Sequence, residues 1–216
     1  VPEPLRCAPT EPVRRAVLDA ADALRAHENI TVVDAAPPPA CLPRTQPIWR
    51  GLALADGGRV YRRTLERAGT RVPDDVSPAI RWIFAQRDAL SATDMSDLLV
   101  ELAAYRHAML RYFEDHEYDA LLCPVSADVA PLHDFTRANL DVFTYTYWFN
   151  LTGQPAAVVR AGTAVLEGDG AVELPVGVQI VARHWREDLC LDLAAIIEAS
   201  DCGGWRPPPM FPFEEG

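Results

Sequence analysis

Residues 174–182, LPVGVQIVA, are the most strand-like stretch of this chain. Their β-branched residues predict a buried strand over 176–182. A turn signal, GDG at residues 168–170, comes shortly before it, and residues 163–166 (TAVL) predict a strand on the other side of that turn. These residues therefore predict two strands connected by a short turn.

Further strands are predicted on both sides of this pair. Residues 156–159 (AAVV) and 118–124 (YDALLCP) have the composition of buried strands, and the second ends at a proline. Near the N-terminus, residues 4–8 and 30–33 (ITVV) predict two strands around a helix that Thr10 caps. That β-α-β order is typical of parallel strands, and the whole chain is interpreted as one α/β unit.

Helical patterns fill most of the remaining chain. The clearest helix covers residues 94–113, where Ser91 or Thr93 can cap the start. A further helix is predicted over 141–150, and a last one over 186–199. One apolar stripe, expected to face the core, contains Met95, Leu98, Leu99, Leu102, Tyr105, Met109 and Phe113.

The charge and the cysteines restrict the possible partners and compartment. A net charge of −11 argues against nucleic acid and anionic membranes, which favour basic surfaces. No apolar run approaches the roughly 18 residues of a membrane span, and residues 1–4 (VPEP) have no feature of a signal peptide. The five cysteines are scattered without metal-site or disulfide spacing, so we expect reduced thiols in a cytoplasmic protein.

Few residues in this chain have the pattern of a catalytic group. All 20 positive residues are arginine, so no lysine base or Schiff base is available within the chain. Cys123 ends a predicted strand, where nucleophiles are often displayed, and His133 is a candidate base for it. Pro124 has no N–H, however, and therefore cannot donate to an oxyanion beside Cys123.

Four motifs, in this order along the chain, resemble the C-terminal part of amidase-signature enzymes. Residues 118–124 are similar to the family's YDxLLxP strand, and residues 149–156 (FNLTGQPA) to its FNxxGxPA segment. Residues 174–179 resemble LPVGVQ, the most specific of the four, and residues 187–189 open the helix that follows. Arg160 departs from the pattern, since the family usually has proline there.

The resemblance implies an α/β/α sandwich around a mixed β-sheet, of which residues 1–216 form the C-terminal portion. It also implies amide hydrolysis by a Ser–cis-Ser–Lys triad, with no metal or organic cofactor. No catalytic residue is carried over, because none of the five serines matches the motif and lysine is absent. In relatives, the stretch before FNxxGxP lines the substrate pocket, which implies substrate contacts for Phe143, Thr144, Tyr147 and Trp148.

Three functional hypotheses remain open at this point. The chain is a fragment or subunit of an amidase, a non-catalytic binding or scaffold domain derived from that fold, or a cysteine hydrolase that uses Cys123. Under the first hypothesis, one sheet is divided between two pieces of chain, which exposes apolar surface and a strand edge. We therefore expect the partner to be an N-terminal catalytic half or another copy, with a small amide as the substrate of the complete enzyme.

Overall fold

The computed structural model describes residues 8–36, 42–71, 76, 81, 89–131, 140–166 and 172–204. The chain divides into two compact units. The first unit comprises Val1–Ala8, Ala35–Tyr118 and Pro131–Gly153, and the second comprises Pro9–Asp34, Asp119–Ala130 and Gln154–Gly216. Among the described residues, no helix is long and apolar enough to cross a membrane.

The second unit is built on a three-stranded antiparallel sheet. Its strands are β1 (Ala120–Pro124), β2 (Ala156–Leu166) and β3 (Val172–Ala182), in the spatial order β1-β3-β2. The strand with the LPVGVQ motif, β3, is therefore central, and it pairs with a neighbour on both edges. Strand β2 continues past the predicted 156–159 as far as Leu166. Its pairing with β3 shifts by one residue between Arg160 and Gly162, and this bulge keeps the two strands paired.

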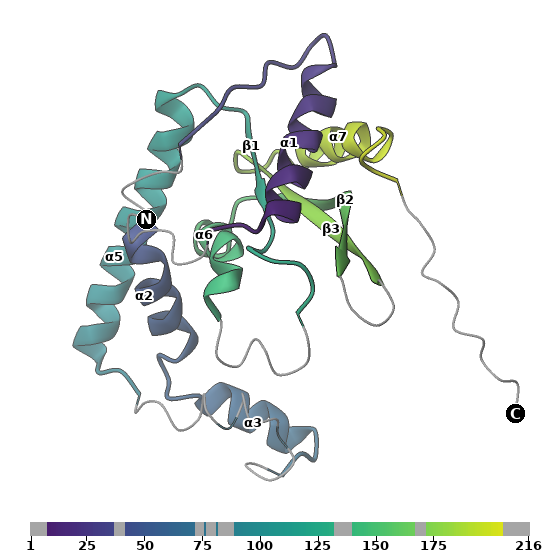
Figure 1. Ribbon diagram of the computed structural model, residues 1–216. Coiled ribbons are helices and arrows are strands. Elements are labelled where there is room, and N and C mark those ends of the chain that lie inside the picture. Colours follow the sequence, from purple (N-terminus) through teal and green to yellow (C-terminus); the bar gives the residue numbers. More distant parts are fainter. Residues whose placement is uncertain are drawn as a thin grey trace, which may run out of the picture. The chain divides into compact units, whose positions relative to one another are not determined.

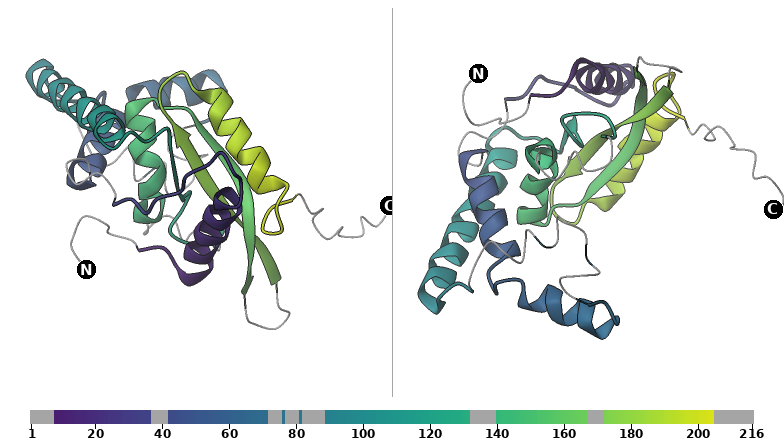
Figure 2. Two further views of the ribbon diagram at one scale, coloured as in Figure 1. Left: turned by 90° about the horizontal axis from the view of Figure 1, so that it is seen from above. Right: turned by 60° about the horizontal axis from the view of Figure 1, so that its bottom comes forward.

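Two helices cover one face of this sheet, as Figures 1 and 2 show. Helix α1 (Glu11–Arg25) and helix α7 (Glu187–Glu198) pack against β2 and β3 and against each other. Gly162 allows the close approach of α1, because a Cβ there would lie 3.3 Å from the Cβ of Ala16. The shared core contains Val13, Ala16, Ala20, Leu24, Ala161, Ala164, Val176, Val178, Ile180 and Ile197.

The N-terminal part of this unit differs from the sequence prediction at two points. The predicted strand over residues 30–33 is wrong: the segment has no strand conformation and pairs with none of the described strands, although Ile30 and Val32 pack against the core. Thr10 is the N-cap of α1, but its hydroxyl donates to Asp128 Oδ1 at 3.2 Å and makes no capping hydrogen bond. The strand predicted over residues 4–8 lies outside the described residues except for Ala8.

The first unit is helical. Helices α2 (Leu42–Ala53) and α5 (Ala92–Asp115) run side by side (Figure 1), and both pack against α6 (Thr144–Thr152). A short 3-10 turn, η2 (Leu140–Phe143), leads into α6, while α3 (Arg59–Arg67) has no buried residue. Across the helices, Thr45 and Tyr105 share a buried hydrogen bond of 3.0 Å, and Arg106 Nε donates to the Leu151 carbonyl at 2.7 Å.

Helix α5 confirms most of the local prediction. Ser91 is its N-cap: the Ser91 hydroxyl accepts from the Asp94 N–H, and the Asp94 carboxylate accepts from the Ser91 N–H. Leu102, Tyr105, Met109 and Phe113 of the predicted stripe are buried. Met95 and Leu98 are only half-buried, and Leu99 is 47% exposed, which departs from the prediction.

Candidate functional site

The aromatic segment that precedes the FNLTGQPA motif forms η2 and the start of α6. Of its four predicted substrate contacts, Thr144, Tyr147 and Trp148 are buried, and only Phe143 remains partly exposed. Tyr147, at 6% exposure, stacks on Trp49 of α2 with ring centroids 4.3 Å apart and planes 16° apart. Of the four residues, only Phe143 therefore has side-chain surface that a substrate could contact. Tyr147 instead contributes to the packing of α6 on α2.

Trp148 faces other aromatic side chains of its own helix. Its ring lies 5.6 Å from that of Tyr145 and 6.0 Å from that of Phe149, the second contact being edge-to-face. These separations are typical of packed aromatic groups in a core. The sequence identified the aromatic residues but not the stack on Trp49, because that contact joins residues far apart in the chain.

Gly153 ends α6 in the left-handed region, with φ of 73°. Its N–H donates to the Phe149 carbonyl at 2.8 Å, and no atom lies within 4 Å of the position of a Cβ. The glycine of the FNLTGQPA motif is therefore required by its backbone conformation and not by lack of space.

The two residues after Gly153 attach to the end of β3 in the second unit. The buried amide of Gln154 donates from Nε2 to the Ala182 carbonyl at 3.1 Å, and the Ala182 N–H donates to the Pro155 carbonyl at 3.1 Å. These two hydrogen bonds fix the start of β2 against β3. Gln154, the glutamine of FNLTGQPA, thus has a structural role in the sheet.

Gln179 links the LPVGVQ motif to the YDALLCP motif. It lies opposite Cys123 in the sheet, and its Nε2 donates to Cys123 Sγ at 3.3 Å and to the Pro124 carbonyl at 3.4 Å. On the same face, a Cβ at Gly177 would come within 3.3 Å of Val158 Cγ1. Gln179 of LPVGVQ therefore contacts β1, and Gly177 leaves room for Val158 of β2.

Cys123 does not have the surroundings of an activated nucleophile. Burial raises the pKa of its thiol to about 12, with the hydrogen bond from Gln179 acting weakly in the opposite direction. At neutral pH the group is therefore the protonated thiol and not the nucleophilic thiolate. His133, the base considered for it, lies outside the described residues.

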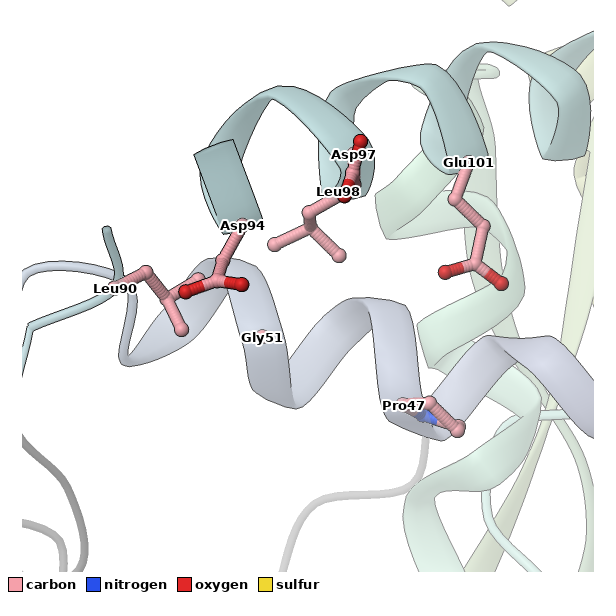
Figure 3. Close-up of a pocket in the computed structure, with 7 residues that line it drawn as sticks. All are labelled: Pro47, Gly51, Leu90, Asp94, Asp97, Leu98 and Glu101. Carbon is pink, nitrogen blue, oxygen red and sulfur yellow. The ribbon is translucent and has the colours of Figure 1, made fainter. Parts of the chain in front are cut away.

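A groove of about 270 Å³ lies between α2 and α5 in the first unit (Figure 3). Asp94, Leu98 and Glu101 project from α5 toward α2, where Gly51 allows the approach because a Cβ there would meet Leu98 Cδ2 at 2.9 Å. Pro47, Leu90 and Asp97 complete the lining.

Two of the three carboxylates around this groove, Asp94 and Glu101, have structural partners. Asp94 belongs to the capping box of α5, and Glu101 pairs with Arg44 at 3.2 Å. Among the residues that the structure describes, no group of three potential ligands could hold a metal ion. The groove is therefore a feature of helix packing, which the sequence did not predict.

A model of the amidase family matches residues 1–191 of this chain. The chain belongs to the amidase family. Fatty acid amide hydrolase 1 of Caenorhabditis elegans is 26% identical over 245 aligned residues, which cover 90% of this chain and 41% of that relative. The 6-aminohexanoate-cyclic-dimer hydrolase of Paenarthrobacter ureafaciens is 41% identical over 159 residues, which cover 66% of this chain and 31% of the hydrolase.

The solved structures support the same relationship. The structure of 6-aminohexanoate cyclic dimer hydrolase complexed with substrate matches with a TM-score of 0.69 and 26% identity, over 90% of this amidase chain and 42% of that chain. The fold is thus a part of the amidase-signature fold with helices and a small antiparallel sheet. This chain spans about two fifths of the length of these relatives.

Proposed function

We propose that this chain is the C-terminal part of an amidase that hydrolyses carbon–nitrogen bonds of amides. The order of the motifs YDALLCP, FNLTGQPA and LPVGVQI within a family match over residues 1–191 carries this proposal. The Ser–cis-Ser–Lys triad comes from another segment of the enzyme, because this chain contains no lysine. That segment corresponds to the greater part of the relatives' length.

In this proposal the chain completes the sheet of the enzyme. Helices α1 and α7 lie on one face of the sheet, and the other face has exposed Val158 and Val165 on β2. Covering that second face produces the α/β/α sandwich, and strands from the catalytic segment make the sheet mixed. Burying apolar side chains at about 25 cal/mol per Å² favours that assembly.

The chain also supplies a wall of the substrate pocket through the start of α6. Phe143 forms the wall, because it retains exposed surface whereas Thr144 is buried. Tyr147 and Trp148 support it from the core, since both are buried and Tyr147 is held by Trp49. A substrate contact at Phe143 is therefore apolar and suits the hydrocarbon part of an amide.

The names of the relatives indicate which substrates to test. A fatty acid amide and the cyclic dimer of 6-aminohexanoate are the compounds after which two of them are named. No metal or organic cofactor is part of the proposal. The enzyme acts in the cytoplasm, in keeping with the free thiols of Cys123, Cys190 and Cys202.

The experiment is a hydrolysis assay of the complete enzyme and of this chain alone. The panel contains a fatty acid amide, the cyclic 6-aminohexanoate dimer and an N-acyl aryl amide. The complete enzyme should hydrolyse at least one of them, and the chain alone should give only the background rate. A complete enzyme without amide hydrolysis on a broad panel would favour the scaffold alternative.

A cysteine hydrolase is the remaining alternative, and it makes a different prediction. Turnover by the chain alone that disappears in Cys123→Ala would support it. The protonated thiol and its hydrogen bond to Gln179 argue against that result.

A further inference from the structure

The turn between β3 and α7 holds Trp185 in an unusual backbone conformation. The Arg186 N–H donates to the Arg183 carbonyl at 3.2 Å and closes a four-residue turn, in which Trp185 is the third residue. Its φ is 66°, in the left-handed region. Glycine is favoured at this position of a turn, because the Cβ of any other residue crowds the backbone. The chain therefore has tryptophan where glycine would cost less.

Contacts on both sides hold this turn in place. The Arg183 N–H donates to the Asp119 carbonyl at 3.3 Å, directly before β1. On the other side, the Arg186 guanidinium pairs with the Asp188 carboxylate at 2.9 Å in the first turn of α7. The turn is therefore attached to β1 and to α7, and the left-handed conformation of Trp185 is part of this arrangement.

The described residues give the Trp185 ring almost no burial. It is 87% exposed, more than any other large apolar side chain that the structure describes. Glu117, the other non-glycine residue with positive φ in the described part of the chain, is polar and exposed. Strained backbone conformations cluster at functional sites, and tryptophan is enriched among the residues that contribute most to protein interfaces. Strain and exposure together therefore indicate a protein partner for this ring.

Two observations favour the catalytic segment of the same enzyme as that partner. The match to the amidase family covers residues 1–191 and so includes this turn. A contact made there belongs to the region that family members share, which favours another shared segment over a partner particular to this protein. In addition, the chain covers only 41% and 42% of two relatives, so most of a relative's length lies outside it.

We propose that Trp185 anchors the interface between this chain and the catalytic segment of the amidase. The inference rests on the proposed function, because that function supplies the segment. The ring inserts into an apolar pocket of the segment, which removes roughly 150–250 Å² of its surface from water and offsets the backbone strain. This contact is separate from the sheet face with Val158 and Val165.

Photo-crosslinking of the complete enzyme identifies the partner directly. The variant Trp185→p-benzoylphenylalanine carries a photoreactive ring, and mass spectrometry of the irradiated protein locates the crosslinked peptides. We expect crosslinks to the segment N-terminal to this chain. The matched control is Glu117→p-benzoylphenylalanine, because position 117 is also left-handed and exposed but natively polar. This control should give no crosslink above that of an unirradiated sample.

The outcomes of this experiment separate the two proposals. No crosslink at position 185, crosslinks only within this chain or between two copies, or equal yields from positions 185 and 117 overturn the inference. Crosslinking does not depend on turnover. An enzyme that crosslinks as expected but hydrolyses no amide would therefore contradict the proposed function and leave the interface intact.

Trp185→Gly in the complete enzyme distinguishes a buried ring from an exposed one by the sign of its effect. Glycine relieves the left-handed strain, so a ring in solvent predicts an unchanged or higher Tm. A ring at the interface predicts a fall in Tm of at least about 2 °C, because the lost contact outweighs the relieved strain. Trp185→Phe retains an aromatic ring and should recover most of the loss. An unchanged or raised Tm for Trp185→Gly overturns the proposal.

Discussion

Replacing Tyr147 with leucine distinguishes a core residue from a pocket residue at the start of α6. The ring is 6% exposed and stacks on Trp49 at 4.3 Å. Replacing a buried aromatic residue with alanine costs about 3–5 kcal/mol. Leucine refills much of the space, so we expect Tyr147→Leu to lower the free energy of unfolding by about 2 kcal/mol, of which the stack contributes about 1.

The expected shift in Tm follows from the size of the chain. At about 2–4 °C per kcal/mol for a protein of roughly this length, Tm should fall by about 4–8 °C. A double-mutant cycle with Trp49→Leu should give a coupling free energy of about 0.5–1.5 kcal/mol, since the two rings contact each other directly. Tyr147→Phe retains the ring and serves as the control for the stack.

Selectivity is measured on the complete enzyme as the ratio of kcat/KM for a small and a bulky amide. Tyr147→Leu should change this ratio by less than about twofold, because a core residue does not discriminate between substrates. Phe143→Leu should alter the ratio while costing under about 1 kcal/mol, as its side chain is partly exposed. A roughly tenfold change in the ratio for Tyr147→Leu, with Tm within about 1 °C of native, would show instead that Tyr147 is a pocket residue.

Three further predictions concern single groups of the chain. Because burial raises the pKa of Cys123 to about 12 and also raises that of Tyr112, the folded protein keeps both protons where the unfolded chain has lost them. The free energy of unfolding should therefore fall as pH rises from about 9 toward 12, by denaturant titration, and Cys123→Ala should reduce the slope. Gly153→Ala places a side chain at φ of 73° and should cost about 1 kcal/mol, with Gly153→Asn costing less. Arg160→Met removes the donor to the Gly204 carbonyl at 2.9 Å, so limited proteolysis on the C-terminal side of Gly204 should accelerate. An unchanged cleavage rate there would count against this contact.

Sequence patterns predicted the elements whose signals are local. Helix α5 follows from its apolar spacing and from Ser91 with Asp94, both of which act within a few residues. The segment at residues 30–33 has equally strong β-branched composition, yet it forms no strand. Ile30 and Val32 pack on the core, while the backbone of this segment pairs with no strand in the described part of the chain. Propensity carries no information about pairing partners.

The candidate site has the same division between local and long-range information. The aromatic residues before FNLTGQPA are visible in the sequence, but the stack of Tyr147 on Trp49 joins residues from two separate helices. Likewise, Gln179 is recognisable as part of LPVGVQ, whereas its hydrogen bonds to Cys123 and Pro124 require the register of β1 against β3. Burial decides which of these side chains are available to a substrate, and burial depends on tertiary contacts.

The most direct test of the central proposal is a titration of the catalytic segment of this amidase with increasing amounts of this chain. The measured quantity is the rate of amide hydrolysis. We expect no hydrolysis above background by either piece alone, and a rate that rises and saturates at a one-to-one ratio. Turnover by this chain alone that survives Cys123→Ala would contradict it.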